Sequence, residues 1–194
     1  METRTLRSEE VRRDRLARRF AHPTESLNCW AEQVHAESGH WLPYFDPADG
    51  GMEARVLLLL ESPGPVVSRT RFVSMDNPDG TAENLRCLLH LSGLRRSDVV
   101  LWNAVPWQMS GAAPLTRHLL TLLPDLRVVV LVGRHAERAW LLVGSALPTL
   151  ACPHPSPQNF VSRREAAVRA LGQLVEARRM ISSTAERATP VPEE

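Results

Sequence analysis

Short apolar runs that alternate with helical segments constrain the fold of this chain most. The runs occupy residues 56–60, 99–102, 128–132 and, in a shorter and weaker form, 150–152. A run without polar alternation is typical of a strand buried on both faces. Helical stretches separate the runs, at residues 81–92, 115–123 and 135–143. The pattern therefore predicts a three-layer α/β/α sandwich with a central four-stranded, mainly parallel sheet.

The sequence predicts three parts of the chain. They are an Arg-rich arm or helix at 1–22, one domain at 23–180 and a disordered tail at 181–194. Seven arginines lie within residues 4–20, where a solvated helix or frayed arm is favoured over an arm that faces phosphates. After Thr24, apolar residues at helical spacing predict a helix that docks on the core. The final helix is expected to open with a capping box at 162–165 and to end near Arg179.

The basic residues exclude one kind of chemistry. The chain has 23 Lys and Arg against 22 Asp and Glu, and every one of these basic residues is Arg. Without lysine, neither a Lys Schiff base nor a P-loop lysine is possible, whereas arginine retains the ability to bind phosphate and carboxylate. A net charge of +1 limits contact with an anionic polymer to a local patch, expected around Arg69, Arg71, Arg163 and Arg164.

The cysteines and the N-terminal sequence indicate the cellular compartment in which we expect the protein. The 3 cysteines are far apart, which argues against disulfides and a four-thiolate cluster and favours a reducing compartment. Cys152 and His154 lack obvious further metal ligands. There is no signal-peptide pattern and no apolar run of membrane-spanning length. We expect a cytoplasmic monomer with no metal, no cofactor and no membrane contact.

Polar and proline-rich loops follow all four predicted strands. Their sequences are Glu61-Ser62-Pro63-Gly64-Pro65, Asn103-Ala104-Val105-Pro106-Trp107, Gly133-Arg134-His135 and Pro153-His154-Pro155-Ser156-Pro157-Gln158-Asn159-Phe160. Ligands of open parallel sheets bind beyond the carboxyl ends of the strands, so these loops predict a site at that edge. A turn-rich segment at 76–80 is expected to lie over it, and His135 is expected to have a local structural role. The usual signatures of dinucleotide enzymes, P-loop NTPases, serine α/β-hydrolases and zincins are absent from the sequence.

Three of these motifs, in this order, resemble the active-site motifs of the uracil-DNA glycosylase superfamily. They are Glu61-Ser62-Pro63-Gly64, the strand-end Asn103, and His154-Pro155-Ser156-Pro157. The resemblance covers about residues 50–180 and is greatest to the bacterial branches with G-E-A-P-G and H-P-S motifs. The chain departs from them at Leu60, which replaces a glycine, and at Gln158, which replaces an apolar residue. It also lacks the cysteines of an iron–sulfur cluster.

The resemblance implies a role for each matching residue. Enzymes of this superfamily flip a nucleotide out of DNA and hydrolyse its N-glycosidic bond. By position, Glu61 would orient or activate water and His154 would donate to the pyrimidine O2. Asn103 would read the base edge and Phe72 would stack on the base. Each of the four residues, taken singly, also has a structural interpretation: a cap for Glu61, a core aromatic for Phe72, an Asx turn for Asn103 and a hydrogen-bonded loop histidine for His154. Ser62, in the first motif, is also expected at the base, and Trp107, which is close to Asn103 in sequence, would line the pocket or close it.

DNA contacts are implied for the region after the last motif. Superfamily members insert a side chain into the base stack there, which points to Gln158 or Phe160. Ser156, Arg163 and Arg164 would contact the DNA backbone, and the two arginines could equally be part of a solvated first helical turn.

The predicted function is that of a monofunctional DNA glycosylase acting on a deaminated base, with uracil favoured over hypoxanthine or another base. Its partner would be DNA containing a damaged base. Two alternatives remain open. One is a non-catalytic member of the fold that binds nucleic acid or a free nucleobase, and the other is a nucleoside hydrolase.

Overall fold

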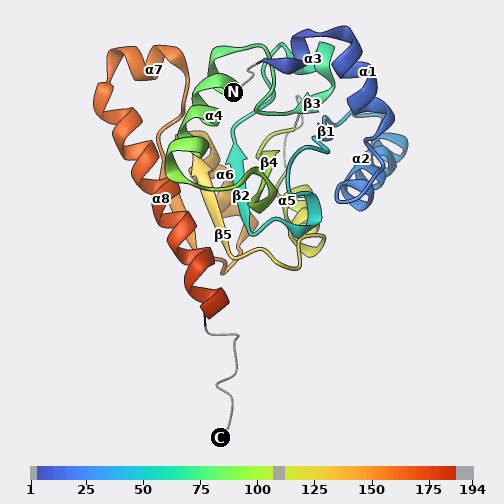
Figure 1. Ribbon diagram of the computed structural model, residues 1–194. Helices are drawn as coiled ribbons and strands as arrows, with labels where there is room; N and C mark the ends of the chain where they lie inside the picture. The colour runs from blue at the N-terminus through green and yellow to red at the C-terminus, as the bar shows by residue number, and fades with distance from the viewer. Residues whose placement is uncertain (1–3, 107–111, 187–194) are drawn as a thin grey trace, which may run out of the picture.

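The computed structural model describes residues 4–106 and 112–186. Its central sheet has four parallel strands in the order β4-β2-β5-β6. They are β2 (Val56–Leu60), β4 (Val99–Asn103), β5 (Val128–Val132) and β6 (Thr149–Cys152). Figure 1 shows the sheet between two groups of helices, so the predicted three-layer α/β/α fold with a four-stranded parallel sheet is confirmed.

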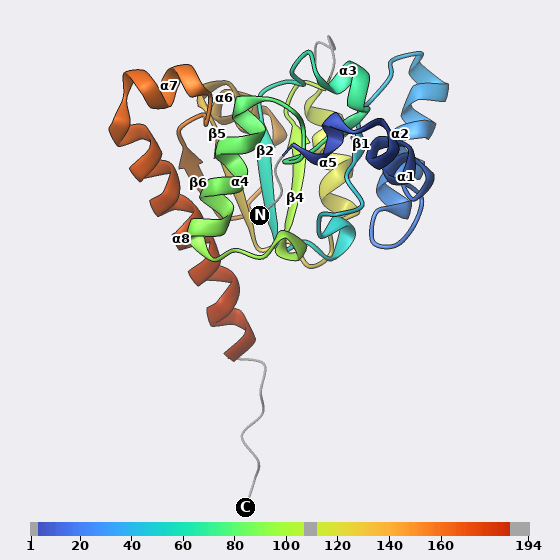
Figure 2. The same ribbon diagram turned by 45° about the horizontal axis from the view of Figure 1, so that its top comes forward.

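Alternate residues of a strand point to opposite faces of the sheet, so apolar strands without polar alternation have two apolar faces. Helices cover both of these faces. Leu58 packs in a cluster with α4 (Gly80–Ser92) and α8 (Arg164–Glu186). Its neighbours Leu57 and Leu59 pack in a second cluster on the other face. The helices that contribute to the second cluster are α2 (Glu25–Ser38), α5 (Ala113–Thr121) and α6 (Arg134–Val143). Figure 2 shows α4 and α8 side by side on their face of the sheet.

Smaller elements complete the fold near the N-terminus and at the carboxyl edge of the sheet. A two-stranded parallel sheet pairs β1 (Tyr44–Phe45) with β3 (Phe72–Val73). Short helices are α1 (Glu9–Ala17), α3 (Val67–Thr70) and α7 (Pro157–Ser162), and 3-10 turns occupy Thr5–Arg7, Gly51–Glu53 and Arg96–Asp98. Residues of β3, α3 and α7 line the candidate site at the carboxyl ends of the central strands. The turns Gly51–Glu53 and Arg96–Asp98 instead precede β2 and β4, at the amino ends.

The N-terminal segment is not wholly a solvated arm. Arg15, on α1, is 8% exposed and forms ion pairs with Asp46 and Asp76. Arg96 also pairs with both carboxylates, and Arg86 pairs with Asp76. The expectation of a solvated helix therefore fails at Arg15, because these buried carboxylates require a cation from α1.

The C-terminal region differs from the predicted capping and boundary. Ser162 ends α7 and its hydroxyl donates to the Gln158 carbonyl, so it does not open the last helix as a capping box. The last helix, α8, continues past Arg179 to Glu186, so residues 181–186 are helical where a tail was expected. Ile181 is 2% exposed and packs against the core, which explains the extension. In the part of the chain that the structure describes, no helix is long and apolar enough to cross a membrane.

Candidate active site

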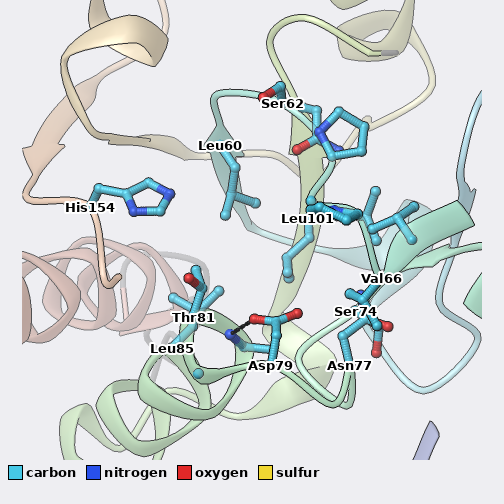
Figure 3. Close-up of a pocket in the computed structure, with 18 of the residues that line it drawn as sticks. Leu60, Ser62, Val66, Ser74, Asn77, Asp79, Thr81, Leu85, Leu101 and His154 are labelled. Carbon is cyan, nitrogen blue, oxygen red and sulfur yellow. Dashed lines mark hydrogen bonds between the residues drawn. The ribbon is translucent and has the colours of Figure 1, made fainter. Parts of the chain in front are cut away.

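A cavity of about 430 Å³ lies at the carboxyl edge of the sheet. Leu60 and Asn103, the last residues of β2 and β4, form part of its wall together with the first turn of α4. His154, beyond β6, lines it as well, and Figure 3 shows this imidazole on the opposite side of the cavity from Ser74 and Asn77. The cavity volume falls in the range of small-molecule sites, about 300–1,000 Å³. The loops of three strands therefore meet at one pocket, as their sequence placement predicted.

Asn103 is the most deeply placed polar side chain taken from the sequence motifs. It ends the fully buried strand β4 and is 2% exposed. Its Nδ2 has no hydrogen-bond partner among the described residues. A buried donor without a partner costs about 1–3 kcal/mol, so such groups are uncommon unless they serve a ligand. Asn103 is thus a candidate for recognition of a polar ligand in the cavity.

Asn77 is a second buried amide at the cavity, and the motif comparison did not single it out. Its Nδ2 donates to the Phe72 carbonyl at 3.0 Å, which fixes the orientation of the amide. Its Oδ1 is buried and has no partner in the described chain. The cavity is therefore lined by one residue with an unpaired amide donor and one with an unpaired amide acceptor. The turn-rich sequence at 76–80 correctly indicated a loop at this edge and gave no sign of the amide's role.

His154 is held in place through its backbone. Asn159 donates to the His154 carbonyl and Asn84 donates to the Pro155 carbonyl, both at 2.9 Å. Desolvation lowers the pKa of His154 below its ordinary value, and the nearby Glu61 opposes this shift. The imidazole is therefore neutral at neutral pH and can donate a hydrogen bond from one ring nitrogen.

Two glycines allow the close packing around this histidine. A Cβ on Gly80, at the start of α4, would lie 2.4 Å from Pro157 Cγ, so the helix can approach the His154 loop only with glycine at this position. Gly133, after β5, has a φ of +90°. A Cβ there would lie 3.2 Å from the His154 Cβ. The neighbouring loops thus restrict the position of His154 from both sides.

Two polar residues of the first motif take different positions relative to the cavity. Ser62 lines the cavity, whereas Glu61 does not. The Glu61 side chain is 44% exposed, and its Oε2 lies 2.7 Å from His135 Nδ1. His135, at the start of α6, was expected to have only a local structural role, and the sequence offered no signal for this pairing. The structure thus places a carboxylate and an imidazole together outside the cavity wall.

Phe72 does not lie where stacking on a base in the cavity would require. The residue is completely buried in β3, and its ring packs against Tyr44 with a centroid distance of 5.9 Å and against Leu6. It does not line the cavity, whereas Val73 does. The prediction of a stacking role is corrected to that of a core aromatic, because the two-stranded sheet turns Phe72 toward the N-terminal segment.

A cationic groove of about 780 Å³ adjoins the cavity. Arg134, Arg163 and Arg169 line it, together with Ser156 and Asn159. None of the three arginines forms an ion pair with a carboxylate in the described residues, although Glu137 also lines the groove. His154 lines both the groove and the cavity, so the two spaces meet at this side chain.

Comparison with family models matches residues 47–174 to the Uracil DNA glycosylase superfamily. The chain belongs to this superfamily. Among solved structures, it is similar to a candidate uracil DNA glycosylase from Methanosarcina acetivorans, solved by solution NMR. The identity is 18% and the TM-score 0.46, over 65% of this chain and 92% of the other. Among curated proteins, no sequence matches.

The remaining residues that the superfamily resemblance implied lie on or near α7. Ser156 caps α7 by accepting from the Asn159 backbone N–H at 3.3 Å. Gln158 is exposed, whereas Phe160 is half-buried against the core. Arg164, the first residue of α8, is exposed and does not line the groove. Trp107 lies outside the described residues.

The ionisable groups of this superfamily member include no metal-binding cluster within residues 4–106 and 112–186. Cys29 and Cys87 are exposed and Cys152 is buried. Desolvation raises the pKa of the Cys152 thiol to about 12, so this group stays protonated at neutral pH.

Proposed function

We propose that the protein is a monofunctional DNA glycosylase that hydrolyses the N-glycosidic bond of a deaminated base, with uracil as the favoured substrate. The observation that carries the proposal is the cavity lined by His154 and by Asn103, whose buried amide donor has no hydrogen-bond partner among the described residues. A base that is flipped out of the duplex would occupy this cavity. Superfamily membership supports the reaction class.

The polar groups of the cavity suit a base with adjacent donors and acceptors. Asn103 would donate to a ring carbonyl, and the fixed Oδ1 of Asn77 would accept from a ring N–H. The neutral His154 would donate to the oxygen that gains charge when the base departs as an anion. A donor aimed at this charge stabilises the transition state more than the ground state.

The sugar would remain at the mouth of the cavity, because it stays joined to the DNA backbone on both sides while the base enters. Glu61 lies on this rim, outside the cavity wall. From there its carboxylate would hold the water that attacks C1′ as the bond to the base breaks. The placement separates the group that acts on the sugar from the groups that bind the base.

The phosphates on either side of the flipped nucleotide need a cationic surface that begins where the cavity ends. The groove formed by Arg134, Arg163 and Arg169 meets this need, since it shares His154 with the cavity. Arginine binds phosphate oxygens with a planar pair of donors. Lysine is absent from the sequence, so a Schiff base with the sugar through a lysine is impossible, which supports hydrolysis without strand cleavage.

The decisive experiment measures release of base from oligonucleotides that contain one uracil, hypoxanthine or xanthine, in single-stranded and double-stranded form. Alkaline cleavage of the resulting abasic site reports activity, and the corresponding free nucleosides are tested in parallel. Release from uracil-containing DNA is expected. Binding without release would favour the non-catalytic alternative, and release from nucleosides alone would favour the nucleoside hydrolase.

Two variants separate the site from the rest of the protein. His154→Ala is expected to lower single-turnover base release about 10²- to 10³-fold, by analogy with the loss of one oxyanion donor. His35→Ala, at an exposed position on α2, is the matched control and should retain full activity. Equal rates for His154→Ala and the wild type would refute the assignment of His154.

A further inference from the structure

Glu61 and His135 belong to loops that follow two neighbouring strands. Glu61 follows β2 directly, and His135 is the second residue of α6, which follows β5. Their side chains approach to 2.7 Å between Glu61 Oε2 and His135 Nδ1, although they are 44% and 62% exposed. Exposed ion pairs contribute little to stability, so protein folding alone gives no strong reason for this arrangement.

The turn that delivers His135 also packs against His154. Gly133 begins this turn with a φ of +90°, and its backbone lies so close to the His154 Cβ that an added Cβ would be 3.2 Å away. The turn is therefore fixed against a residue of the cavity on one side, and it presents the imidazole of His135 to Glu61 on the other. The position of His135 relative to the cavity is set by this packing and does not depend on its own exposed side chain.

We propose that His135 is a positioning residue that orients the Glu61 carboxylate for attack of water on the sugar. The inference rests on the proposed glycosylase function. In that reaction the water oxygen bonds to C1′ and the C1′–N bond breaks. The electron pair of this bond goes to the base, and the water proton goes to Glu61. In the proposed arrangement His135 Nδ1, which lies 2.7 Å from Oε2, holds that oxygen and leaves Oε1 for the water.

The chemistry of the two side chains explains why such a partner is needed. A carboxylate only accepts hydrogen bonds, so His135 must present a proton at Nδ1. A half-exposed glutamate otherwise samples several rotamers, and a hydrogen bond at one oxygen restricts this freedom. A small displacement of a reacting group can cost two orders of magnitude in rate, so restriction of Glu61 is catalytically valuable.

Activity measurements on three variants test the positioning role. His135→Ala is expected to lower single-turnover base release about 10- to 100-fold. His135→Asn, whose side-chain NH₂ can donate from nearly the same place as Nδ1, should recover most of this loss. In a Glu61→Gln background, His135→Ala should cause no further loss, because no carboxylate is left there to be oriented for the water. His35→Ala serves as the matched histidine control.

NMR of the His135 imidazole tests the pair without reference to activity. The chemical shift of a ring nitrogen depends on what that nitrogen contacts, so Glu61→Gln should change the Nδ1 shift of His135. An unchanged Nδ1 shift, or base release by His135→Ala at the wild-type rate, overturns the inference while the proposed function stands. A wild-type protein that releases no base from any substrate overturns the proposed function, and the positioning role with it.

Discussion

Arg15 Nη1 lies 2.5 Å from Asp46 Oδ1, which joins the N-terminal helix to the loop after β1. The same guanidinium reaches Asp76, whose neighbour Asn77 lines the cavity. Asp46 also accepts a hydrogen bond from Ser74, another residue of the cavity wall. The N-terminal helix therefore supports the loop that forms one side of the candidate active site.

Removal of this cation should destabilise the protein strongly. Arg15→Ala leaves the buried carboxylates of Asp46 and Asp76 with one cation fewer, and loss of a partner from a buried pair typically costs about 3–5 kcal/mol. Urea denaturation of the purified variant measures the free energy of unfolding. Arg13→Ala, which removes an exposed pair with Glu9, is the matched control and should change stability little. Equal effects of the two substitutions would contradict the structural role of Arg15.

Asp49 gives stability a dependence on pH. Burial raises its pKa from 3.8 to about 7, and pairing with Arg96 only partly opposes this shift. Because the pKa is higher in the folded state, stabilisation from this group is complete below about pH 3.8 and is lost as the pH rises to about 7. Asn does not titrate, so Asp49→Asn should gain stability relative to the wild type over this interval, by an amount on the order of 4 kcal/mol.

Urea denaturation at several pH values between about 5 and 8 measures this difference. Asp125→Asn, at an exposed position before β5, is the control and should follow the wild type. A constant difference between Asp49→Asn and the wild type across the range would show that Asp49 does not titrate there.

Gly133→Ala should affect both stability and activity. The backbone at Gly133 has φ +90° and ψ +160°, a region that only glycine adopts readily, so alanine should cost about 1–3 kcal/mol. Its Cβ would also press on the Cβ of His154 and displace the imidazole. Gly144→Ala is the control, because its φ is also positive, +67°, but no atom lies within 4 Å of the added Cβ. Base release below that of Gly144→Ala, measured where both variants are folded, would identify the contact with His154 as the cause.

The cationic groove predicts a change in the salt dependence of DNA binding. Arg163→Ala and Arg169→Ala should each weaken binding to DNA of any sequence and reduce the slope of log K against log salt by about 1. Arg127→Ala removes an exposed arginine at the amino end of β5, the opposite edge of the sheet, and should leave the slope unchanged. Fluorescence anisotropy at several salt concentrations measures these slopes. Three variants with the same slope would show that DNA does not occupy the groove.

The sequence was sufficient to predict the sheet and the edge at which the site lies. A run such as 128–132 has no polar face, so it can be stable only when both faces are covered by helices. Parallel strands then bring the loops with Asn103 and His154 to the same edge, whatever the order of the strands. Local rules of burial and connection therefore predicted the fold and the position of the cavity.

The direction of individual side chains could not be predicted in the same way. Phe72 follows the first motif in sequence, but contacts with Leu6 and Tyr44 draw its ring away from the cavity. Asn77 lines the cavity with its amide held by the Phe72 carbonyl, and no sequence pattern encodes that bond. Both outcomes depend on contacts within the folded chain that a local pattern does not contain.

The sequence by itself determined the four strands of the central sheet, the absence of lysine chemistry, and the placement of Asn103 and His154 at one edge of that sheet. The tertiary structure alone decided that Arg15 is buried and that His135 meets Glu61. The strands could be predicted because strand formation depends on the apolar character of neighbouring residues, which is visible in the sequence. Pairing of charged groups depends on which distant loops are brought within a few ångströms, and only the packed fold sets those distances.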